Sequence, residues 1–194
     1  MNSPNLFPEQ APIWPVGLSY VPLFMTPAEQ QFLVDAIDTH HWSLELKRRV
    51  QHYGYRYDYK SRRLDPSMYL GPLPFFVANF LPRLEANAAF SQLPDQLIAN
   101  EYQPGQGISA HVDCEPCFNN RIASVSLGSP CEIEFRHRPS DRILKLTLAA
   151  GSLLVMADEA RYDWTHQIRP RLQDNGMPRR RRISLTFRKV VLPS

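Results

Sequence analysis

The spacing of hydrophobic positions changes character near residue 95. Before that point, two segments carry apolar residues at helical spacing. The sequence "TPAE" at residues 26–29 has the form of a capping box with proline at the first helical position, and it predicts a helix that runs to about His40. A second helix is predicted over roughly residues 74–90, where Pro82 is expected to kink or interrupt it.

The same half of the chain also carries two patterns that are typical of strands. The segment "LSYVPLFM" at residues 18–25 alternates between apolar and polar positions, as a short strand does. Residues 44–59 are rich in aromatic residues and valine, and the local sequence "VQHYGYRYDY" predicts a hairpin around Gly54.

After residue 95 the chain consists of short alternating segments with turns between them. This spacing is typical of a sandwich or a jelly-roll barrel. The candidate strands are QLIANEY, IASVSLG, CEIEFRH, ILKLTLA, SLLVMA, YDWTHQI and RRISLTFRKVVL.

These patterns predict a mainly β fold with supporting helices. The expected architecture is a double-stranded β-helix, or jelly-roll barrel, with an N-terminal extension of helices and a hairpin. One domain is expected over residues 16–194, with the extension over residues 16–94 and the barrel core over residues 95–194. Residues 1–15 are proline-rich with little periodicity, so a flexible lead-in is expected there.

Composition narrows the class of protein. A chain of 194 residues that is 43% hydrophobic suits one domain with a sizeable core. No run reaches the ~18 to 20 apolar residues of a membrane span, and the first residues lack the basic flank and apolar segment of a signal peptide. A cytoplasmic protein without a membrane partner is therefore expected.

The cysteines and the charges add two local observations. Three cysteines give no disulfide framework and agree with a reducing compartment. Cys114 and Cys117 have the spacing of half a structural zinc site, but Cys131 lies in a predicted strand and the other half is missing. The net charge of +3 is mild, yet basic residues gather at residues 47–63 and 179–182, and such patches favour a polyanionic partner.

The turn-rich stretch "NEYQPGQGISAHVD" ends in a His-x-Asp pair. In a strand, His111 and Asp113 would point to the same face and could bind one ion. Such a pair also occurs by chance on protein surfaces, and His166 in "WTHQI" is what favours a metal. Two histidines and one carboxylate form the facial triad of non-haem Fe(II) oxygenases, which leaves positions open for co-substrate and O2.

The last predicted strand carries Arg182 and Arg188 on one face, together with Ser184 and Thr186. Two guanidinium groups on a largely apolar strand are costly unless they meet anions, and arginine binds carboxylates in a bidentate manner. A dicarboxylate that chelates iron fits this pattern. The alternative is a solvated basic face, which suits residues 179–181 better than Arg188.

Together these blocks resemble the AlkB family of Fe(II)- and 2-oxoglutarate-dependent dioxygenases. N-x-Y-x-P-G, H-x-D, a distal His and R-x-x-x-x-x-R follow in the family's order over roughly residues 97–190. "RRVQHYGY", "YQPGQGI", "SVSLGS", "SLLVM" and "RYDWTH" are most similar to the AlkB-homology domain of the eukaryotic hydroxylases of modified wobble uridines in tRNA. The RNA-recognition and methyltransferase domains found there have no counterpart in these residues, so that substrate is not carried over.

The resemblance implies that His111, Asp113 and His166 bind Fe(II) and form the catalytic centre. It also implies that O2 and 2-oxoglutarate are consumed there to hydroxylate a substrate C–H bond. A hydroxylated N-methyl group would leave a base as formaldehyde, whereas a carbon that is not on nitrogen would keep its hydroxyl group.

The resemblance also implies a co-substrate site. Arg182, helped by Tyr102, is expected to pair with the distal carboxylate of 2-oxoglutarate. Arg188 and Asn100 are expected to serve the carboxylate next to the keto group. Ser184 stands where the family commonly has asparagine between the two arginines, so the packing of the co-substrate differs there.

Residues 47–63 interleave cations with four tyrosines, which is typical of a lid over a flipped or single-stranded nucleotide. The alternative is a hairpin with a solvated face and inward tyrosines. Glu115 is a candidate acceptor for an exocyclic amine or a surface residue, and Arg161 a candidate substrate contact or a salt-bridge partner. The candidate substrate residues are Tyr53, Tyr55, Arg56, Tyr57, Glu115 and Arg161.

The sequence therefore predicts a dioxygenase that acts on alkylated or modified bases in nucleic acid, with RNA or single-stranded DNA favoured. Its expected cofactors are Fe(II), 2-oxoglutarate and O2. Three alternatives stay open: a tRNA wobble-base hydroxylase, a protein demethylase, and a non-catalytic nucleic-acid-binding domain. The base lesion and the oligomeric state do not follow from the sequence.

Overall fold

The computed structural model describes residues 14–59 and 61–193. The flexible lead-in predicted over residues 1–15 lies outside these ranges, apart from Trp14 and Pro15. Within the described ranges, no helix is long and apolar enough to cross a membrane.

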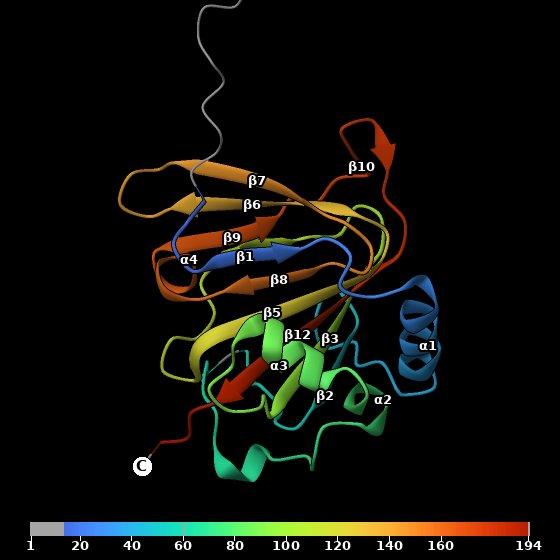
Figure 1. The fold of residues 1–194 in the computed structure, drawn as a ribbon, viewed down its shortest axis with the longest axis vertical. Helices are drawn as coiled ribbons and strands as arrows, with labels where there is room; N and C mark the ends of the chain where they lie inside the picture. Colours follow the sequence, from blue (N-terminus) through green and yellow to red (C-terminus); the bar gives the residue numbers. More distant parts are fainter. Residues whose placement is uncertain (1–13, 60, 194) are drawn as a thin grey trace, which may run out of the picture.

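Two antiparallel sheets face each other and form the predicted jelly roll (Figure 1). The larger sheet has six strands in the order β1-β8-β5-β12-β3-β2, and the smaller has four in the order β4-β9-β6-β7. The strand bounds are β1 Leu18–Val21, β2 Val50–Tyr53, β3 Gln96–Tyr102, β4 Ile108–His111, β5 Phe118–Gly128, β6 Cys131–His137, β7 Ile143–Leu148, β8 Leu153–Met156, β9 Trp164–Ile168, β10 Gln173–Asp174, β11 Met177–Pro178 and β12 Arg182–Val190.

The strands predicted after residue 95 are all present, as β3, β5, β6, β7, β8, β9 and β12. Strand β4 was not predicted, because the turn-rich sequence before His111 hides its alternation, and the short ribbon of β10 and β11 was not predicted either. The start predicted for β9 is wrong, because the short helix α4 (Asp158–Tyr162) occupies that segment.

The first helix, α1 (Pro27–Asp38), confirms its predicted start. The Thr26 hydroxyl accepts a hydrogen bond from the Glu29 amide at 3.2 Å, and the Glu29 carboxylate accepts one from the Thr26 amide at 2.8 Å. This reciprocal pair satisfies two amides that would otherwise lack partners at the helix end.

The single helix predicted over residues 74–90 is wrong, although the interruption was predicted. The segment forms two helices, α2 (Phe75–Ala78) and α3 (Leu81–Ala88), and Pro82 stands in the first turn of the second. Proline is tolerated there because first-turn amides have no helical partner. A 3-10 turn, η1 (Pro66–Met68), precedes them in the chain.

The hairpin predicted around Gly54 is also wrong, because β2 pairs with β3 of the barrel instead. Gly54 turns the chain at a φ of +77°, and a Cβ atom there would lie 1.8 Å from the Asp95 carbonyl oxygen, so only glycine fits. Beyond it, Tyr55 makes an isolated bridge to Tyr69 rather than a second hairpin strand.

The larger sheet has two faces of different character. Its outer face packs against α1, α2 and α3, which gather beside it in Figure 1. Odd-numbered residues of the central strands form this face, whereas even-numbered residues point between the sheets, as the two-residue period of a strand requires. The outward odd-numbered residues are Leu97, Ala99, Ala123, Val125, Leu127, Leu153, Val155, Ile183, Leu185 and Phe187.

Candidate active site

A cavity of about 870 Å³ opens between the two sheets. Inward residues of β3, β5, β8 and β12 line one wall, and residues of β4, β6, β7 and β9 line the other. The segment before and after β2 contributes further side chains. The predicted metal ligands and both predicted arginines of β12 line this single space.

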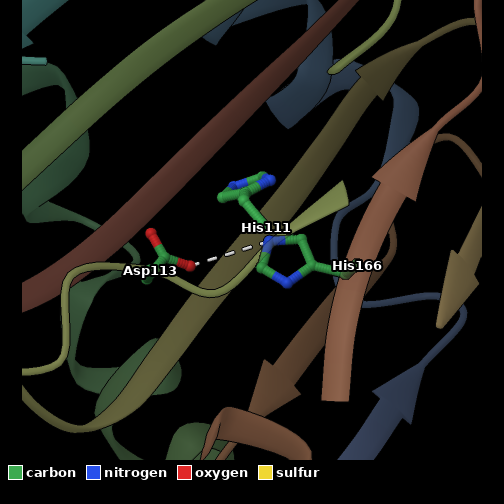
Figure 2. Close-up of side chains that lie close together, drawn as sticks. All are labelled: His111, Asp113 and His166. Atoms are coloured by element: carbon green, nitrogen blue, oxygen red, sulfur yellow. Dashed lines mark ion pairs between the residues drawn. The ribbon is translucent and has the colours of Figure 1, made fainter. Parts of the chain in front are cut away.

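His111, Asp113 and His166 converge on one point of the cavity wall, each offering a ligand atom within 4.8 Å of the others (Figure 2). His111 on β4 lies directly opposite His166 on β9 in the antiparallel register. Their ring centroids are 4.3 Å apart. The strand pairing therefore brings together two histidines that are distant in the sequence.

Asp113 reaches the same point from a loop, not from a strand. β4 ends at His111, so the expected strand alternation does not place this carboxylate. Instead, Arg188 Nη2 contacts Asp113 Oδ1 at 2.5 Å, and the buried Arg161 donates to the backbone carbonyls of Asp113 and Cys114 at 2.9 and 3.1 Å. Two arginines thus fix the loop that carries the carboxylate.

The protonation states suit a metal. Burial, together with the nearby His111, lowers the pKa of His166 to about 3, so its ring is neutral at pH 7. Burial would raise the pKa of Asp113, but the positive charge of Arg188 holds that pKa below its ordinary value, so the carboxylate is ionised. His111 Nδ1 lies 2.8 Å from the Ser109 carbonyl oxygen, to which it can donate, which leaves Nε2 as the ligand atom.

Arg182 is buried at the start of β12, in the cavity wall formed by the larger sheet. Its Nη2 donates to the Ser126 hydroxyl at 2.9 Å, and its guanidinium carbon lies 5.4 Å from the centre of the Tyr102 ring. Its Nε and Nη1 have no partner among the described residues. A buried guanidinium with free N–H groups in a cavity fits a carboxylate ligand, because unpaired buried charge is costly.

The hydroxyls and amide beside Arg182 follow from the strand register. Ser184 lies between Asn100 on β3 and Ser126 on β5, and its hydroxyl is 2.8 Å from that of Ser124. Ser124 lines the cavity, although it was not a predicted site residue. Only the β5–β12 register could have shown that it faces the same space as Ser184.

The comparison with known proteins agrees with this geometry. A family model described as 2OG-Fe(II) oxygenase superfamily matches residues 17–188. The chain belongs to this superfamily. Its cofactors are therefore Fe(II) and 2-oxoglutarate, with O2 as the co-substrate, and the two histidines, the carboxylate and the unpaired arginine are groups of the kind that these ligands require.

Two curated relatives show the predicted resemblance to AlkB proteins. The oxygenase is 39% identical to the Arabidopsis thaliana "Alkylated DNA repair protein ALKBH8 homolog" over 90% of this chain and 58% of that protein. It is 37% identical to the Xenopus tropicalis "tRNA (carboxymethyluridine(34)-5-O)-methyltransferase alkbh8" over 84% of this chain and 27% of that protein.

The fold is also that of a solved structure, "The structure of OsALKBH1", with a TM-score of 0.69. The likeness covers 92% of this chain and 99% of that one, at 18% sequence identity. The oxygenase therefore has the expected barrel, and it spans between about a quarter and three fifths of the length of the two curated relatives.

The predicted lid of the oxygenase contributes to the cavity only in part. Tyr57 lines the cavity, but Tyr53 packs against Phe76, and neither Tyr55 nor Arg56 is among the lining residues. The structure thus places these three away from the cavity, because β2 joins the barrel, and their contact with a substrate stays a prediction. The lining residues of the segment are Leu46, Lys47, Arg48, Tyr57, Tyr59 and Arg62.

Two further predicted substrate residues, Glu115 and Arg161, occupy different positions relative to the cavity. Glu115 lines the cavity at its exposed edge and lies 3.8 Å from Arg138, which also lines the cavity. Arg161 is not a lining residue of the cavity; it donates to the backbone carbonyls of the Asp113 loop, and its contact with a substrate stays a prediction.

Arg48 was not singled out as a site residue, yet it joins the lid segment to the barrel. Its Nε donates to Asn100 Oδ1 at 2.9 Å, and its guanidinium carbon lies 5.7 Å from the centre of the Tyr102 ring. No local sequence signal distinguishes it from its neighbours, because only the β2–β3 pairing carries it over the cavity.

Basic residues 179–182 do not form one solvated patch. Arg179 is buried and donates to Asp174 at 2.6 and 2.9 Å. Arg181 donates to Asp38 and Glu101 at distances of 2.6 to 2.7 Å. The alternative of a solvated basic face therefore does not hold for Arg179 and Arg181, since acidic partners engage both.

The cysteines also differ from expectation. Cys114 and Cys117 form a disulfide, so they are neither half of a zinc site nor free thiols. The pair follows Asp113 directly and packs in a small apolar cluster with Leu64, Phe118 and Val190. Cys131 is the free cysteine of the described ranges, and it is buried.

Proposed function

We propose that this oxygenase hydroxylates alkylated or modified bases in nucleic acid, with RNA or single-stranded DNA favoured. The observation that carries the proposal is the mouth of the cavity that holds the metal triad. Cations and aromatic rings line it together, and this combination binds phosphates and unpaired bases. The lining residues of this kind are Lys47, Arg48, Tyr57, Tyr59, Arg62 and Arg138.

We assign the residue roles on the same basis. His111, Asp113 and His166 would hold Fe(II), and Arg182, with Tyr102 and Ser184 beside it, would hold the distal carboxylate of 2-oxoglutarate. When bound, iron with 2-oxoglutarate and O2 supplies the oxidation of a substrate C–H bond.

Arg188 would serve two groups at once. Its Nη2 holds Asp113, whereas its Nε is buried with no partner among the described residues, so it is free to face the second carboxylate of the co-substrate. Asn100, which accepts from Arg48, would contact the same carboxylate through its amide nitrogen. The residues of this chain therefore orient the co-substrate and keep the metal-binding carboxylate ionised.

Two outcomes of the reaction are distinguished by the carbon attacked. A hydroxylated N-methyl group leaves as formaldehyde, whereas a hydroxylated carbon off nitrogen is retained. The 39% identity to a protein named for alkylated DNA repair supports dealkylation. The 37% identity to a protein named for tRNA carboxymethyluridine supports a second candidate, hydroxylation of a tRNA base. The predicted domain bounds of residues 16–194 and the cytoplasmic location stay predictions.

The deciding experiment incubates the protein with Fe(II), 2-oxoglutarate, O2 and a panel of alkylated oligonucleotides and tRNA. Mass spectrometry then reads each base for a loss of methyl or a gain of oxygen. His111→Ala serves as the matched control for uncatalysed oxidation. Succinate release without any change in the nucleic acids, together with modification of a methylated peptide, would replace this proposal with a protein substrate.

A further inference from the structure

Tyr59 stands apart from the other tyrosines of the lid segment. It lines the cavity, and its hydroxyl oxygen is buried with no hydrogen-bond partner among the described residues. Buried hydroxyl groups nearly always have partners in folded proteins, because an unpaired one destabilises the fold. A buried hydroxyl group without a partner in a cavity wall therefore indicates a ligand that forms a hydrogen bond with it.

The ring that carries this hydroxyl is held in place from two sides. It packs against His52, with ring centroids 5.7 Å apart, and against the edge of Tyr57 at 5.1 Å. His52 Nε2 in turn lies 3.0 Å from Glu45 Oε1, and the Tyr57 ring packs 5.8 Å from Phe118 at the start of β5. The hydroxyl position is thus fixed by packing before any ligand arrives.

The protonation state of Tyr59 also suits a neutral hydrogen bond. Burial raises the pKa of its hydroxyl to about 12, against the weaker opposing effect of the nearby positive charges of Arg48 and Arg188. The group therefore stays protonated at neutral pH, and it can donate to a carbonyl oxygen or ring nitrogen and accept from an amine.

We propose that the Tyr59 hydroxyl forms a direct hydrogen bond with the substrate base. This bond would position the base between the lid segment and the metal triad. This inference rests on the proposed function, because it takes the occupant of the cavity mouth to be a nucleobase. The co-substrate is the less suitable partner, since Arg182 and Arg188 already offer unpaired N–H groups to its carboxylates. Tyr59 instead belongs to the segment that brings Arg48 and Tyr57 over the cavity from outside the barrel.

The test compares Tyr59→Phe with Tyr69→Phe, which removes the same atom from a half-exposed tyrosine outside the cavity. The probe is a fluorescein-labelled single-stranded RNA that carries the base modified by the wild type, or an unmodified RNA if binding alone is detected. Each variant is loaded with Mn(II) and 2-oxoglutarate without O2 for binding, and with Fe(II) and O2 for turnover.

For Tyr59→Phe we expect RNA affinity to fall about three- to tenfold, the effect of one lost neutral hydrogen bond. The ratio of succinate released to base modified should rise, because a badly positioned base receives the oxidation less often. The thermal midpoint of the ligand-free protein should stay equal or rise, and the dissociation constant of 2-oxoglutarate should stay within about twofold. Tyr69→Phe should change none of these quantities.

The outcomes separate this inference from the proposed function. If the wild type neither binds nor modifies any nucleic acid, the proposed function fails, and this inference fails with it. If the wild type acts on RNA but Tyr59→Phe matches it in affinity and coupling, only the Tyr59 role is wrong. A lower midpoint without ligand would make the hydroxyl structural, and a weakened 2-oxoglutarate affinity without RNA would assign it to the co-substrate.

Discussion

The two faces of the larger sheet are built from alternate residues of the same strands, yet one is packed and largely apolar whereas the other lines the cavity with polar groups. On β12, Leu185 and Phe187 are fully buried in the apolar layer under the helices. Their neighbours Arg182, Ser184 and Arg188 face the cavity with polar groups, several of them without partners. One face of this strand therefore stabilises the fold, and the other face presents the polar side chains of the candidate active site.

The difference shows where stability and function come from in this fold. The outer face gains free energy mainly from burial of apolar surface. Its buried Glu101 is already paired within the fold, with Arg49 and Arg181. The inner face keeps buried guanidinium groups that cost stability until ligands arrive. Substitutions on the two faces should consequently separate effects on unfolding from effects on binding and turnover.

The largest expected effect is on the metal. His111→Ala should lower succinate release by more than about a hundredfold, since even the supporting partners of metal ligands are worth ~10- to 100-fold. The substitution lies on the inner side of β4, so the thermal midpoint of the metal-free protein should change little. Succinate formation and the unfolding curve are measured on one preparation, and near-wild-type turnover would place the metal elsewhere.

A substitution on the outer face should lower stability and leave binding unchanged. Leu185→Ala removes a fully buried side chain from the layer between the sheet and the helices. We expect a loss of about 2–5 kcal/mol in the free energy of unfolding, the usual range for such cavities. Urea denaturation measures the loss, and the 2-oxoglutarate affinity of the folded fraction should be unchanged. A selective loss of that affinity would show that the two faces are coupled.

Arg181 and Arg182 sharpen the comparison, because adjacent residues point to opposite faces. Arg182→Lys should weaken 2-oxoglutarate binding by about tenfold, since lysine keeps the charge but lacks the planar fork. Arg181→Lys should leave that affinity unchanged and lower stability by about 1 kcal/mol through weaker pairing with Asp38 and Glu101. Quenching of tryptophan fluorescence in the anaerobic Mn(II) form measures binding, and equal affinities in the two variants would remove Arg182 from the site.

The smallest expected effect concerns the rim of the cavity. Replacing Arg62 and Arg138 together by glutamine should weaken single-stranded RNA binding and reduce the log–log salt slope by ~0.7 for each lost phosphate contact. Arg56→Gln is the matched control, since Arg56 is exposed, pairs with Glu45 and does not line the cavity. Affinity is measured between low and moderate salt. If the salt slope changed only in the Arg56→Gln control, the RNA would bind along the outer surface and not at the rim of the cavity.

Much of the barrel could be predicted from the sequence because its strands are local patterns. Alternation over residues 131–137 or 182–190 requires no knowledge of a partner strand, and the Thr26 capping box involves residues three apart. The three candidate metal ligands and Arg182 could also be selected from the sequence, since the residue types and their order along the chain carry the resemblance to the family.

The lid segment was predicted less well, because its local pattern is compatible with two partners. "VQHYGYRYDY" suits a hairpin, but β2 pairs with β3 and Gly54 turns the chain against the Asp95 carbonyl. That choice directs Tyr53 and Tyr55 away from the cavity and leaves Tyr57 and Tyr59 to line it.

The sequence by itself thus determined which residues can bind iron and a dicarboxylate, because chemistry resides in side-chain types. Only the tertiary structure decided which of them meet. His111 faces His166 through a register between strands distant in the chain, and Arg161 donates to the backbone carbonyl of Asp113 from a helix far along the sequence. Strand pairing and burial are set by the packing of the whole barrel, and no local pattern contains that information.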